Sequence, residues 1–349
     1  MKYFKSAFTY VELILVVFII SLLGTLVVVN TLNSRSKSRD LQKIGEVIQV
    51  QNALEDYKNI EGSYPTELIL GSSLIGTLSG VVFLDKIPDY IFYIFFNNNY
   101  YELEFELENK LDIFNSGFNL LTPVGHASDD INFYSSNYHL YFNGIDNYIR
   151  SDKNIDFNIN SGDYSVSAWI YVDNAEIMNW QTVMGIGEQY TLGFHLYANR
   201  ICTYGDLTAF CVSFDSFISR NNWHLISAVH DYNNKKITTY VDGIKVNEGT
   251  YGINLVNAIN RPVTSGYRGT ADYFKGYIYD ARIYKRALSS DEMFSLYESK
   301  KISSKDLLVR WQMNEGSGCL VNDNFINVIN GNLLVNCPEN SPTWVMNTN

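Results

Sequence analysis

The four cysteines of the chain have the clearest potential chemistry, because they form two local pairs, Cys202 with Cys211 and Cys319 with Cys337. Four cysteines allow three disulfide connectivities. Neither pair has the Cys-x-x-Cys spacing of zinc and redox sites, so we interpret both as structural disulfides of a protein outside the cytoplasm. Buried free thiols are the alternative. We expect the two local pairings, since turn residues within each segment can bring the sulfur atoms together.

Four glutamates alternate with apolar residues between Tyr101 and Glu108, which is the pattern of a half-buried strand with one acidic face. They are Glu102, Glu104, Glu106 and Glu108. Their carboxylates could bind a cation or a basic neighbour. However, carboxylates at alternate strand positions do not close the oxygen cage that calcium requires. We therefore interpret the four glutamates as a solvated face.

Motifs of catalysis are missing from the sequence, which has no nucleophile elbow, no HExxH zinc motif and no P-loop. The five histidines do not cluster: they are His126, His139, His195, His224 and His230. The acidic pair Asp129 and Asp130 lies in a predicted linker, whereas glycoside hydrolysis needs two rigid carboxylates that face a cleft. We therefore expect no catalytic residues and a protein that is not an enzyme.

Composition excludes other classes of protein. The formal net charge of −11 and the pI near 4.9 argue against nucleic-acid binding, which requires a basic patch. Aromatic residues make up 15% of the chain and charged residues only 18%, as in a folded, β-rich protein with an uncharged polar surface. A chain of 349 residues is expected to contain two or three domains.

The elements that position these residues begin with an uncharged apolar stretch from Leu13 to Ser34, long enough for a helix to cross a hydrocarbon layer of about 30 Å. We expect a membrane span over about residues 11–31. Apolar residues then recur every three or four positions as far as Tyr57, so we predict one helix over residues 8–60. A carboxylate at Glu12 would cost about 2–3 kcal/mol or more if unpaired, which implies a partner outside this chain.

The segment KSAFTYVELILVVFIISLLG resembles the class III signal of type IV prepilins and pseudopilins. This resemblance implies that a prepilin peptidase removes leader residues 1–7 by cleavage between Ala7 and Phe8, and that Phe8 is then N-methylated. The family prefers glycine where this chain has Ala7. The resemblance also implies that Glu12 pairs with the terminal amine of a neighbouring subunit during assembly. A secretory signal peptide fits less well because the apolar part is too long, and a plain anchor leaves Glu12 unexplained.

Residues 61–119 are predicted to form a small β head. The segments GSYPTE and IPDYIFYIFFNNNYYELEFELENK again resemble pilins and pseudopilins. Independently of that resemblance, the aromatic-rich runs Tyr90 to Phe96 and Tyr100 to Glu108 flank three asparagines, which predicts a hairpin. Residues 120–130 are expected to be a linker.

Short β-forming runs alternate with turn residues over residues 131–299, which predicts a β-sandwich. Its segments resemble laminin-G-like, concanavalin A-like jelly-roll modules in the order of that family. The matching segments are YFNGIDNYIRS, DYSVSAWIYV, NNWHLISAVHDYNNKKITTYVDGIKV and YFKGYIYDARIYKRALSSDEMFSLYES. A short helix is expected to begin at Ser289 or Ser290. The segment LLVRWQMNEGSGCLVNDNFINVINGNLLVNCPENSPTWV resembles the part that precedes the FNG strand in the same family. It either begins a second module that stops early or supplies the first strands of this one. An isolated half sandwich would expose an apolar edge, so we expect residues 300–349 to complete the sandwich in a permuted arrangement, with Trp311 and Trp344 buried.

The predicted fold class is therefore α+β: a long N-terminal pilin helix with a small β head, followed by an all-β jelly-roll sandwich. The jelly-roll resemblance implies binding of glycans or proteins through loops at one rim, sometimes with calcium. Trp180 and Tyr190 are candidates for stacking on a sugar, whereas Trp169 and Trp223 are interpreted as core residues. The candidate calcium ligands are Asn143, Asp146, Asp242 and Asp280. We favour a turn role for them and expect no required cofactor.

Together these features predict a pilin-like fibre subunit that displays a lectin-like module for adhesion to glycan or protein ligands. A minor or tip position is expected, because the bulky module would crowd a fibre. The expected partners are other pilin subunits and prepilin peptidase. The expected location is the bacterial inner membrane, single-pass with a cytoplasmic N-terminus, before assembly and the extracellular pilus or pseudopilus afterwards. Two alternatives remain open: a pseudopilin of a type II secretion or DNA-uptake machine that recognises cargo, and a membrane-anchored carbohydrate-active enzyme.

Overall fold

The protein divides into two compact units, Met1–Ser128 and Asp129–Asn349. The computed structural model describes residues 10–98, 100–123, 125–126, 138–157, 162–173, 179–186, 193–205, 208–213, 215–251, 258–267, 272–298, 302–323, 329–333, 337 and 341–346. Ala7, Phe8 and Tyr190 lie outside these ranges, and the side chain of Glu12 is not described. The predictions made for these four residues therefore stay predictions.

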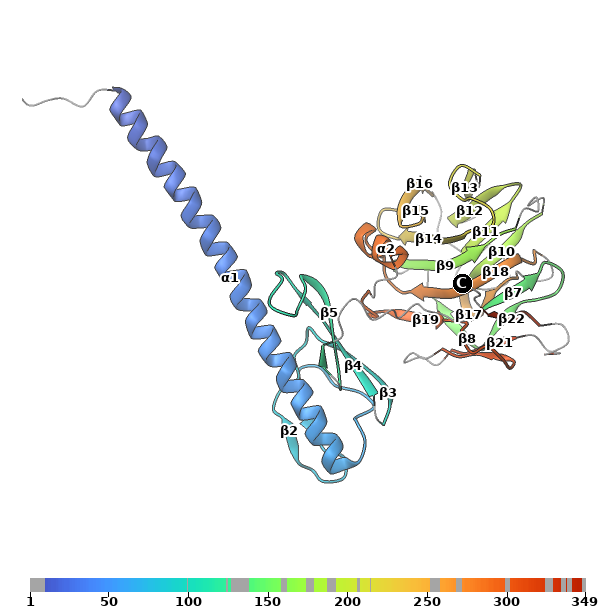
Figure 1. The fold of residues 1–349 in the computed structure, drawn as a ribbon, viewed down its shortest axis with the longest axis horizontal. Helices are drawn as coiled ribbons and strands as arrows, with labels where there is room; N and C mark the ends of the chain where they lie inside the picture. The colour runs from blue at the N-terminus through green and yellow to red at the C-terminus, as the bar shows by residue number, and fades with distance from the viewer. Residues whose placement is uncertain are drawn as a thin grey trace, which may run out of the picture. The chain divides into compact units, whose positions relative to one another are not determined.

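The first unit begins with α1, a helix of 52 residues from Tyr10 to Glu61 (Figure 1). It ends where expected, because Gly62 adopts a positive φ of 87° and its amide donates a hydrogen bond of 2.8 Å to the Lys58 carbonyl. Among the described side chains, which leave out residues 22–33 of α1, no helix is long and apolar enough to cross a membrane. The span predicted over residues 11–31 is therefore not supported by the structure.

The C-terminal half of α1 packs on a small antiparallel sheet in the order β3-β4-β5-β6. The strands of this unit are β1 Leu74–Ile75, β2 Val82–Leu84, β3 Phe92–Asn97, β4 Tyr100–Leu107, β5 Gly117–Thr122 and β6 Gly125–His126. The hairpin of β3 and β4 confirms the predicted one. Val50 and Leu54 of α1 and Leu103 of β4 are fully buried in the shared core. Strands β5 and β6 occupy residues that we expected to begin a linker.

The acidic row of β4 differs from the prediction. Glu106 and Glu108 are exposed, but Glu102 and Glu104 are only 3% and 2% exposed. The reason is that β4 is a middle strand: Glu104 lies in register between Phe92 of β3 and Leu120 of β5, whose side chains flank it. The interpretation of all four glutamates as a solvated face is therefore wrong for the first two.

A buried carboxylate fixes α1 to the end of β4. Asp40 accepts hydrogen bonds from the backbone amides of Glu108 and Asn109 at 3.0 and 2.8 Å and from the Asn109 side chain at 2.8 Å. Burial raises the pKa of Asp40, but these hydrogen bonds outweigh burial and lower it. Beside it, Arg39 binds Glu108 through two nitrogens, at 2.9 and 2.7 Å. These contacts fix where the helix meets the head.

The second unit is a jelly-roll sandwich of two antiparallel sheets (Figure 1). The first sheet has the order β13-β12-β11-β10-β17-β8-β21-β20, and the second has the order β16-β15-β14-β9-β18-β7-β22, with β19 also paired to β18. Its elements are β7 Tyr138–Asn143, β8 Ile149–Phe157, β9 Tyr164–Tyr171, β10 Gln181–Ile186, β11 Gly193–Tyr197, β12 Arg200–Gly205, β13 Thr208–Ser213, β14 Trp223–Asp231, β15 Lys236–Val241, β16 Ile244–Thr250, β17 Ala258–Ser265, β18 Lys275–Tyr284, α2 Ser290–Tyr297, β19 Leu307–Trp311, β20 Leu320–Val321, β21 Gly331–Leu333 and β22 Thr343–Met346.

Helix α2 begins as the sequence predicts. Ser289 is its N-cap and accepts a hydrogen bond from the Glu292 amide, while the Glu292 side chain accepts one from the Ser289 amide. This reciprocal capping box satisfies two backbone donors that the first turn leaves without helical partners. Met293 and Leu296 form the buried side of the helix.

The tail contributes strands to both sheets. Strand β19 pairs with β18 and β22 with β7 in the second sheet, while β21 pairs with β8 and β20 with β21 in the first. Trp311 is fully buried, as predicted. Trp344 is only half-buried, because β22 is an edge strand, so that prediction is wrong. Both disulfides, Cys202–Cys211 and Cys319–Cys337, are present and confirm the predicted bridges.

Candidate ligand-binding site

Four aromatic residues form a row across adjacent strands of the second sheet. In register, Trp223 of β14 faces Tyr171 of β9, Tyr171 faces Tyr277 of β18, and Tyr277 faces Tyr141 of β7. We call these four residues the aromatic row. Neighbouring strands lie about 4.8 Å apart, so a row over four strands is about 14 Å long.

The aromatic row lies on the outer face of the sheet. Side chains alternate between the two faces of a strand, and the residues next to the row, Ile170 and Ile278, are fully buried in the core between the sheets. The four members of the row are half-buried. The outer face of an antiparallel sheet is ordinarily polar. An aromatic row in this position is therefore a candidate binding surface.

The rings of the row contact one another at tilted and edge-on angles. Ring centroids are 5.7 Å apart for Tyr171 and Trp223, 5.3 Å for Tyr171 and Tyr277, and 5.1 Å for Tyr141 and Tyr277. The His139 ring lies edge-on to both Tyr277 and Trp223, at 5.0 and 5.2 Å. Each ring is held by its neighbours, so the surface is formed before a ligand arrives.

One side of the row is closed by α2. Trp169, the next outward residue on β9, stacks between Tyr279 of β18 and Tyr297 of α2, with centroids at 5.6 and 5.9 Å. Trp169 is 8% exposed, so it is buried as predicted, but it lies on the outer face against α2 and not in the core between the sheets. Trp223 was expected in the core and is instead half-buried on the outer face. A shift of one residue along a strand moves a side chain to the other face, and the sequence did not fix the face for Trp223.

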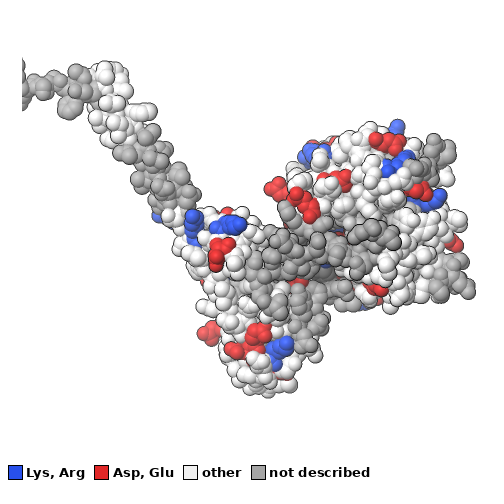
Figure 2. Space-filling model, in the orientation of Figure 1, with Lys and Arg blue, Asp and Glu red and all other residues white. Residues whose placement is uncertain are grey.

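The row itself carries no formal charge. Burial raises the pKa of Tyr277, and the neighbouring phenols of Tyr141 and Tyr171 raise it further, so the hydroxyl stays protonated at neutral pH. The nearest outward charges along the strands, Lys275 and Asp173, form an exposed pair at 3.8 Å. Charges are also sparse on the visible surface of this unit (Figure 2). The row therefore offers aromatic faces and neutral hydroxyl groups to a ligand.

Trp180, which the sequence singled out for stacking, precedes β10 and so belongs to the first sheet, not to the row. It is half-buried and stacks on Tyr197 with centroids 4.3 Å apart and planes 10° apart. One face of its ring is therefore already covered by a protein side chain.

The four candidate calcium ligands do not form one site. Asn143 and Asp146 share a turn, where the Asn143 amide donates to Asp146 at 2.7 Å. Asp242 accepts hydrogen bonds from the Leu225 amide at 3.0 Å and contacts His224 Nδ1 at 2.6 Å. Asp280 lies within β18, so the favoured turn role is wrong for it, and its carboxylate is buried between Arg282 and Arg310. Within the described ranges, no three His, Cys, Asp or Glu side chains are grouped to hold a metal ion.

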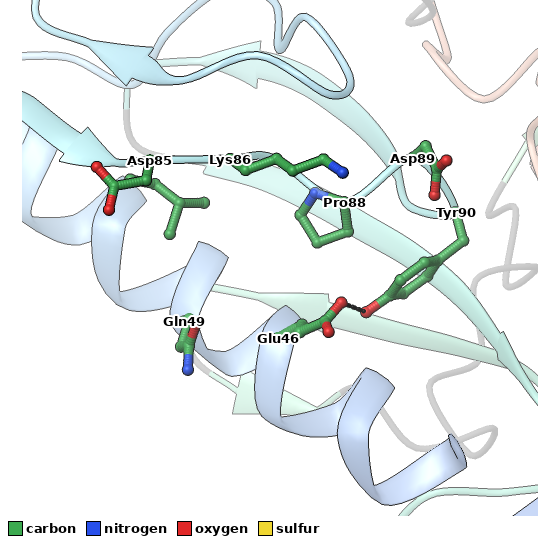
Figure 3. Close-up of a pocket in the computed structure, with 8 residues that line it drawn as sticks. Glu46, Gln49, Asp85, Lys86, Pro88, Asp89 and Tyr90 are labelled. Carbon is green, nitrogen blue, oxygen red and sulfur yellow. Dashed lines mark hydrogen bonds between the residues drawn. The ribbon is translucent and has the colours of Figure 1, made fainter.

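A pocket of about 380 Å³ in the first unit lies between α1 and the loop that joins β2 to β3 (Figure 3). Glu46 of α1 accepts a hydrogen bond of 2.8 Å from the Tyr90 hydroxyl at its edge (Figure 3). Hydrogen bonds from Gln42 and then Tyr90 lower the pKa of Glu46. The pocket therefore presents an ionised Glu46 beside the hydroxyl of Tyr90.

The buried side chain of His230 makes the stability of the sandwich depend on pH. It is 1% exposed, and its ring stacks between Tyr164 and Tyr251 with centroids at 4.5 and 5.0 Å. Burial lowers its pKa from 6.5 to about 4, against a smaller opposite effect of Asp231. The unfolded chain therefore binds a proton between pH 6.5 and 4 that the folded unit excludes. We expect the free energy of unfolding to fall by about 3 kcal/mol as the pH falls through this window.

Denaturant unfolding of the wild type and His230→Phe at pH 7, 5.5 and 4 checks this prediction. The variant should lose less stability than the wild type over the window, because a phenyl ring cannot take up the proton. Equal losses in the two proteins would contradict the assignment to His230.

Parts of the chain are similar to known proteins. Residues 142–293, less than half of the chain, match a family model described as the concanavalin A-like lectin/glucanases superfamily, so this part of the chain is similar to the lectin-like domains of that superfamily. A short N-terminal stretch of 62 residues is 32% identical to the type II secretion system core protein G of Aeromonas hydrophila. That similarity covers 18% of this chain, and the chain spans less than half, 43%, of the relative's length.

Among solved structures, a Bacteroides ovatus protein proposed to bind carbohydrate is similar at 14% identity, with a TM-score of 0.46, over 67% of this chain and 66% of that one. A heptameric pentraxin of Limulus polyphemus is similar at 10% identity, with a TM-score of 0.36, over 46% of this chain and 82% of that one. Similarities at this level support no conclusion about this chain.

Proposed function

We propose that the chain is a pilin-like fibre subunit whose C-terminal unit binds saccharides on the aromatic row, for adhesion outside the cell. The observation that carries the binding role is the row itself: four half-buried aromatic residues in register on the outer face of a sheet. The C–H groups of a pyranose ring form an apolar face that packs on an aromatic ring, while its hydroxyls hydrogen-bond to phenol groups. The length and lack of charge of the row suit an extended neutral saccharide.

The chemistry of the aromatic row supports binding of a ligand without catalysis. Glycoside hydrolysis requires two carboxyl groups on either side of the scissile bond. The carboxylate that follows the row along β9, that of Asp173, pairs with Lys275. We therefore propose a binding protein rather than an enzyme.

The pilin-like role rests on the N-terminus. The class III signal, the 52-residue helix α1 packed on a small β head, and the short similarity to a secretion-system core protein all support it. In this proposal the subunit is held in the inner membrane before cleavage between Ala7 and Phe8, and joins a fibre in a minor or tip position afterwards. Mass spectrometry of the mature chain tests this step, and a retained Met1 would contradict it.

A pseudopilin of a secretion machine is the second candidate, and the name of the Aeromonas hydrophila relative favours it. In that case the aromatic row would recognise exported cargo rather than a surface glycan. Immunogold labelling of intact cells distinguishes the two roles: label on extended surface fibres supports adhesion, and label confined to the cell envelope supports secretion.

A glycan array with two row variants tests the binding role. Trp223→Ala and Tyr277→Ala should each weaken binding of the best saccharide on the order of tenfold, because each removes one ring contact. Tyr197→Ala is the matched control, since Tyr197 is a 39% exposed tyrosine on the first sheet, stacked on Trp180. Loss of binding in Tyr197→Ala, with both row variants folded and unaffected, would contradict the proposal and favour Trp180.

A further inference from the structure

The first sheet carries a second open pocket, of about 400 Å³, on the other side of the sandwich from the aromatic row. Its lining residues are Tyr148, Arg150, Ser151, Cys319, Leu320, Asn332 and Leu333. Pockets of about 300–1,000 Å³ are typical of small-ligand sites. We call this cavity the tail pocket, because four of these residues come from the C-terminal tail.

Strand pairing assembles the tail pocket from two distant parts of the chain. Arg150 of β8 faces Asn332 of β21, and Asn332 faces Leu320 of β20, so the three residues form one outward row. Arg150, Leu320 and Asn332 are all exposed. The Cys319–Cys337 disulfide and a hydrogen bond of 2.9 Å from the Leu333 amide to the Cys319 carbonyl fix the tail side. The lectin-like match ends at residue 293, so it contains only three of the seven lining residues.

The ring of Tyr148, which is fixed by stacking, forms one wall of the tail pocket. Tyr148 stacks on Tyr267 with centroids 4.4 Å apart and planes 24° apart, and Tyr267 contacts Tyr273 at 5.2 Å. Gly266, which precedes this stack, has a φ of 81°, and a side chain there would collide with the Phe142 ring. The backbone therefore turns sharply at the point that places Tyr267 behind Tyr148.

The lining residues of the tail pocket favour a negatively charged ligand. Among the seven described lining residues, Arg150 is the only charged side chain. A guanidinium group binds a carboxylate through two parallel hydrogen bonds. The Ser151 hydroxyl already donates to the Lys153 carbonyl at 2.6 Å and accepts from the Val263 amide at 2.9 Å, so it serves the fold. The Asn332 amide lies in the same outward row as Arg150 and can bind sugar hydroxyls as a donor or as an acceptor.

We propose that the tail pocket binds an acidic saccharide, with the carboxylate on Arg150, the sugar ring on Tyr148 and hydroxyls on Asn332. The net charge of −11 disfavours non-specific binding of anions to this chain. The site lies on the opposite sheet from the aromatic row and does not depend on saccharide binding there.

The experiment titrates the purified full chain with a panel of uronic-acid and sialic-acid oligosaccharides and with their carboxyl methyl esters. We expect at least one acid to bind the wild type, with binding at least tenfold weaker for its ester and for Arg150→Gln. Arg200→Gln is the matched control, because Arg200 is an exposed arginine on the same sheet and the change in charge is identical. Its affinity should stay within twofold of the wild type.

Three results would overturn the proposal: no acid on the panel binds, esters bind as well as acids, or Arg150→Gln keeps its affinity. A cross-test separates the two sites. Trp223→Ala should leave acid binding unchanged, and Arg150→Gln should leave neutral-saccharide binding unchanged. Loss of acid binding in Trp223→Ala, with the variant folded, would assign the acid to the aromatic row and contradict the tail pocket.

Discussion

Replacing Trp311 with alanine is expected to lower the free energy of unfolding of the C-terminal unit by about 3–5 kcal/mol. The side chain is fully buried, and its Nε1 donates a hydrogen bond of 2.8 Å to the Ile329 carbonyl. Gly331 of β21 lies so close that an added Cβ would be 3.1 Å from the Trp311 ring. Truncation would therefore leave a cavity between two tail strands and remove the partner of a carbonyl.

Trp344→Ala is the matched control, because Trp344 is also a tail tryptophan whose Nε1 donates to a carbonyl, that of Gly318 at 3.0 Å. It is half-buried on the edge strand β22, so its loss should cost less than half as much. Urea unfolding of the two variants measures the difference. Equal costs would contradict the view that Trp311 holds the tail in the sandwich.

Asp280→Asn is expected to lower the free energy of unfolding by about 3–5 kcal/mol, because it leaves buried positive charges without their counterion. The Asp280 carboxylate is 3% exposed and accepts hydrogen bonds of 2.9 Å from the Nε atoms of both Arg282 and Arg310. Burial alone would raise its pKa, but the two guanidinium groups lower it to about 2. The ionised form thus stabilises the fold above pH 3.8, and this contribution is lost as the pH falls toward 2.

Asp215→Asn provides the control, since Asp215 is paired with Arg220 at 3.3 Å but its side chain is 56% exposed. Exposed pairs contribute about 0–1 kcal/mol. Thermal unfolding at neutral pH compares the two variants with the wild type. Asp280→Asn should be clearly more destabilising than Asp215→Asn. If it were not, the buried contacts of Asp280 with Arg282 and Arg310 would not hold β18 to β19 as described.

Features set by neighbouring residues could be predicted from the sequence. The end of α1 at Gly62, the hairpin of β3 and β4, and the capping box of Ser289 and Glu292 each depend on a few adjacent residues. The Cys202–Cys211 disulfide belongs to the same group, because it joins facing residues of one hairpin.

Features set by strand register could not be predicted. Glu104 is buried only because Phe92 and Leu120 lie on either side of it, and neither neighbour is implied by the residues around Glu104. The buried Asp280 has a φ of 45° at an irregularity in β18, which breaks the simple alternation of side chains. A partner such as Arg310 is then brought to it by strand β19 of the tail.

The aromatic row was visible in the sequence only as fragments. Tyr277 and Tyr279 alternate with Ile278, and Trp169 and Tyr171 alternate with Ile170. Alternation normally identifies the core face by contrast with polar residues. Here both faces are apolar, so the pattern gives no contrast, and the four strands that assemble the row are adjacent only in the folded sheet.

The most direct test of the account is a crystal structure of the protein with the neutral saccharide that binds best on the glycan array. We predict electron density for sugar rings packed across the four strands, on Trp223, Tyr171, Tyr277 and Tyr141. A saccharide bound elsewhere on the sandwich, with the row open to solvent, would contradict the account.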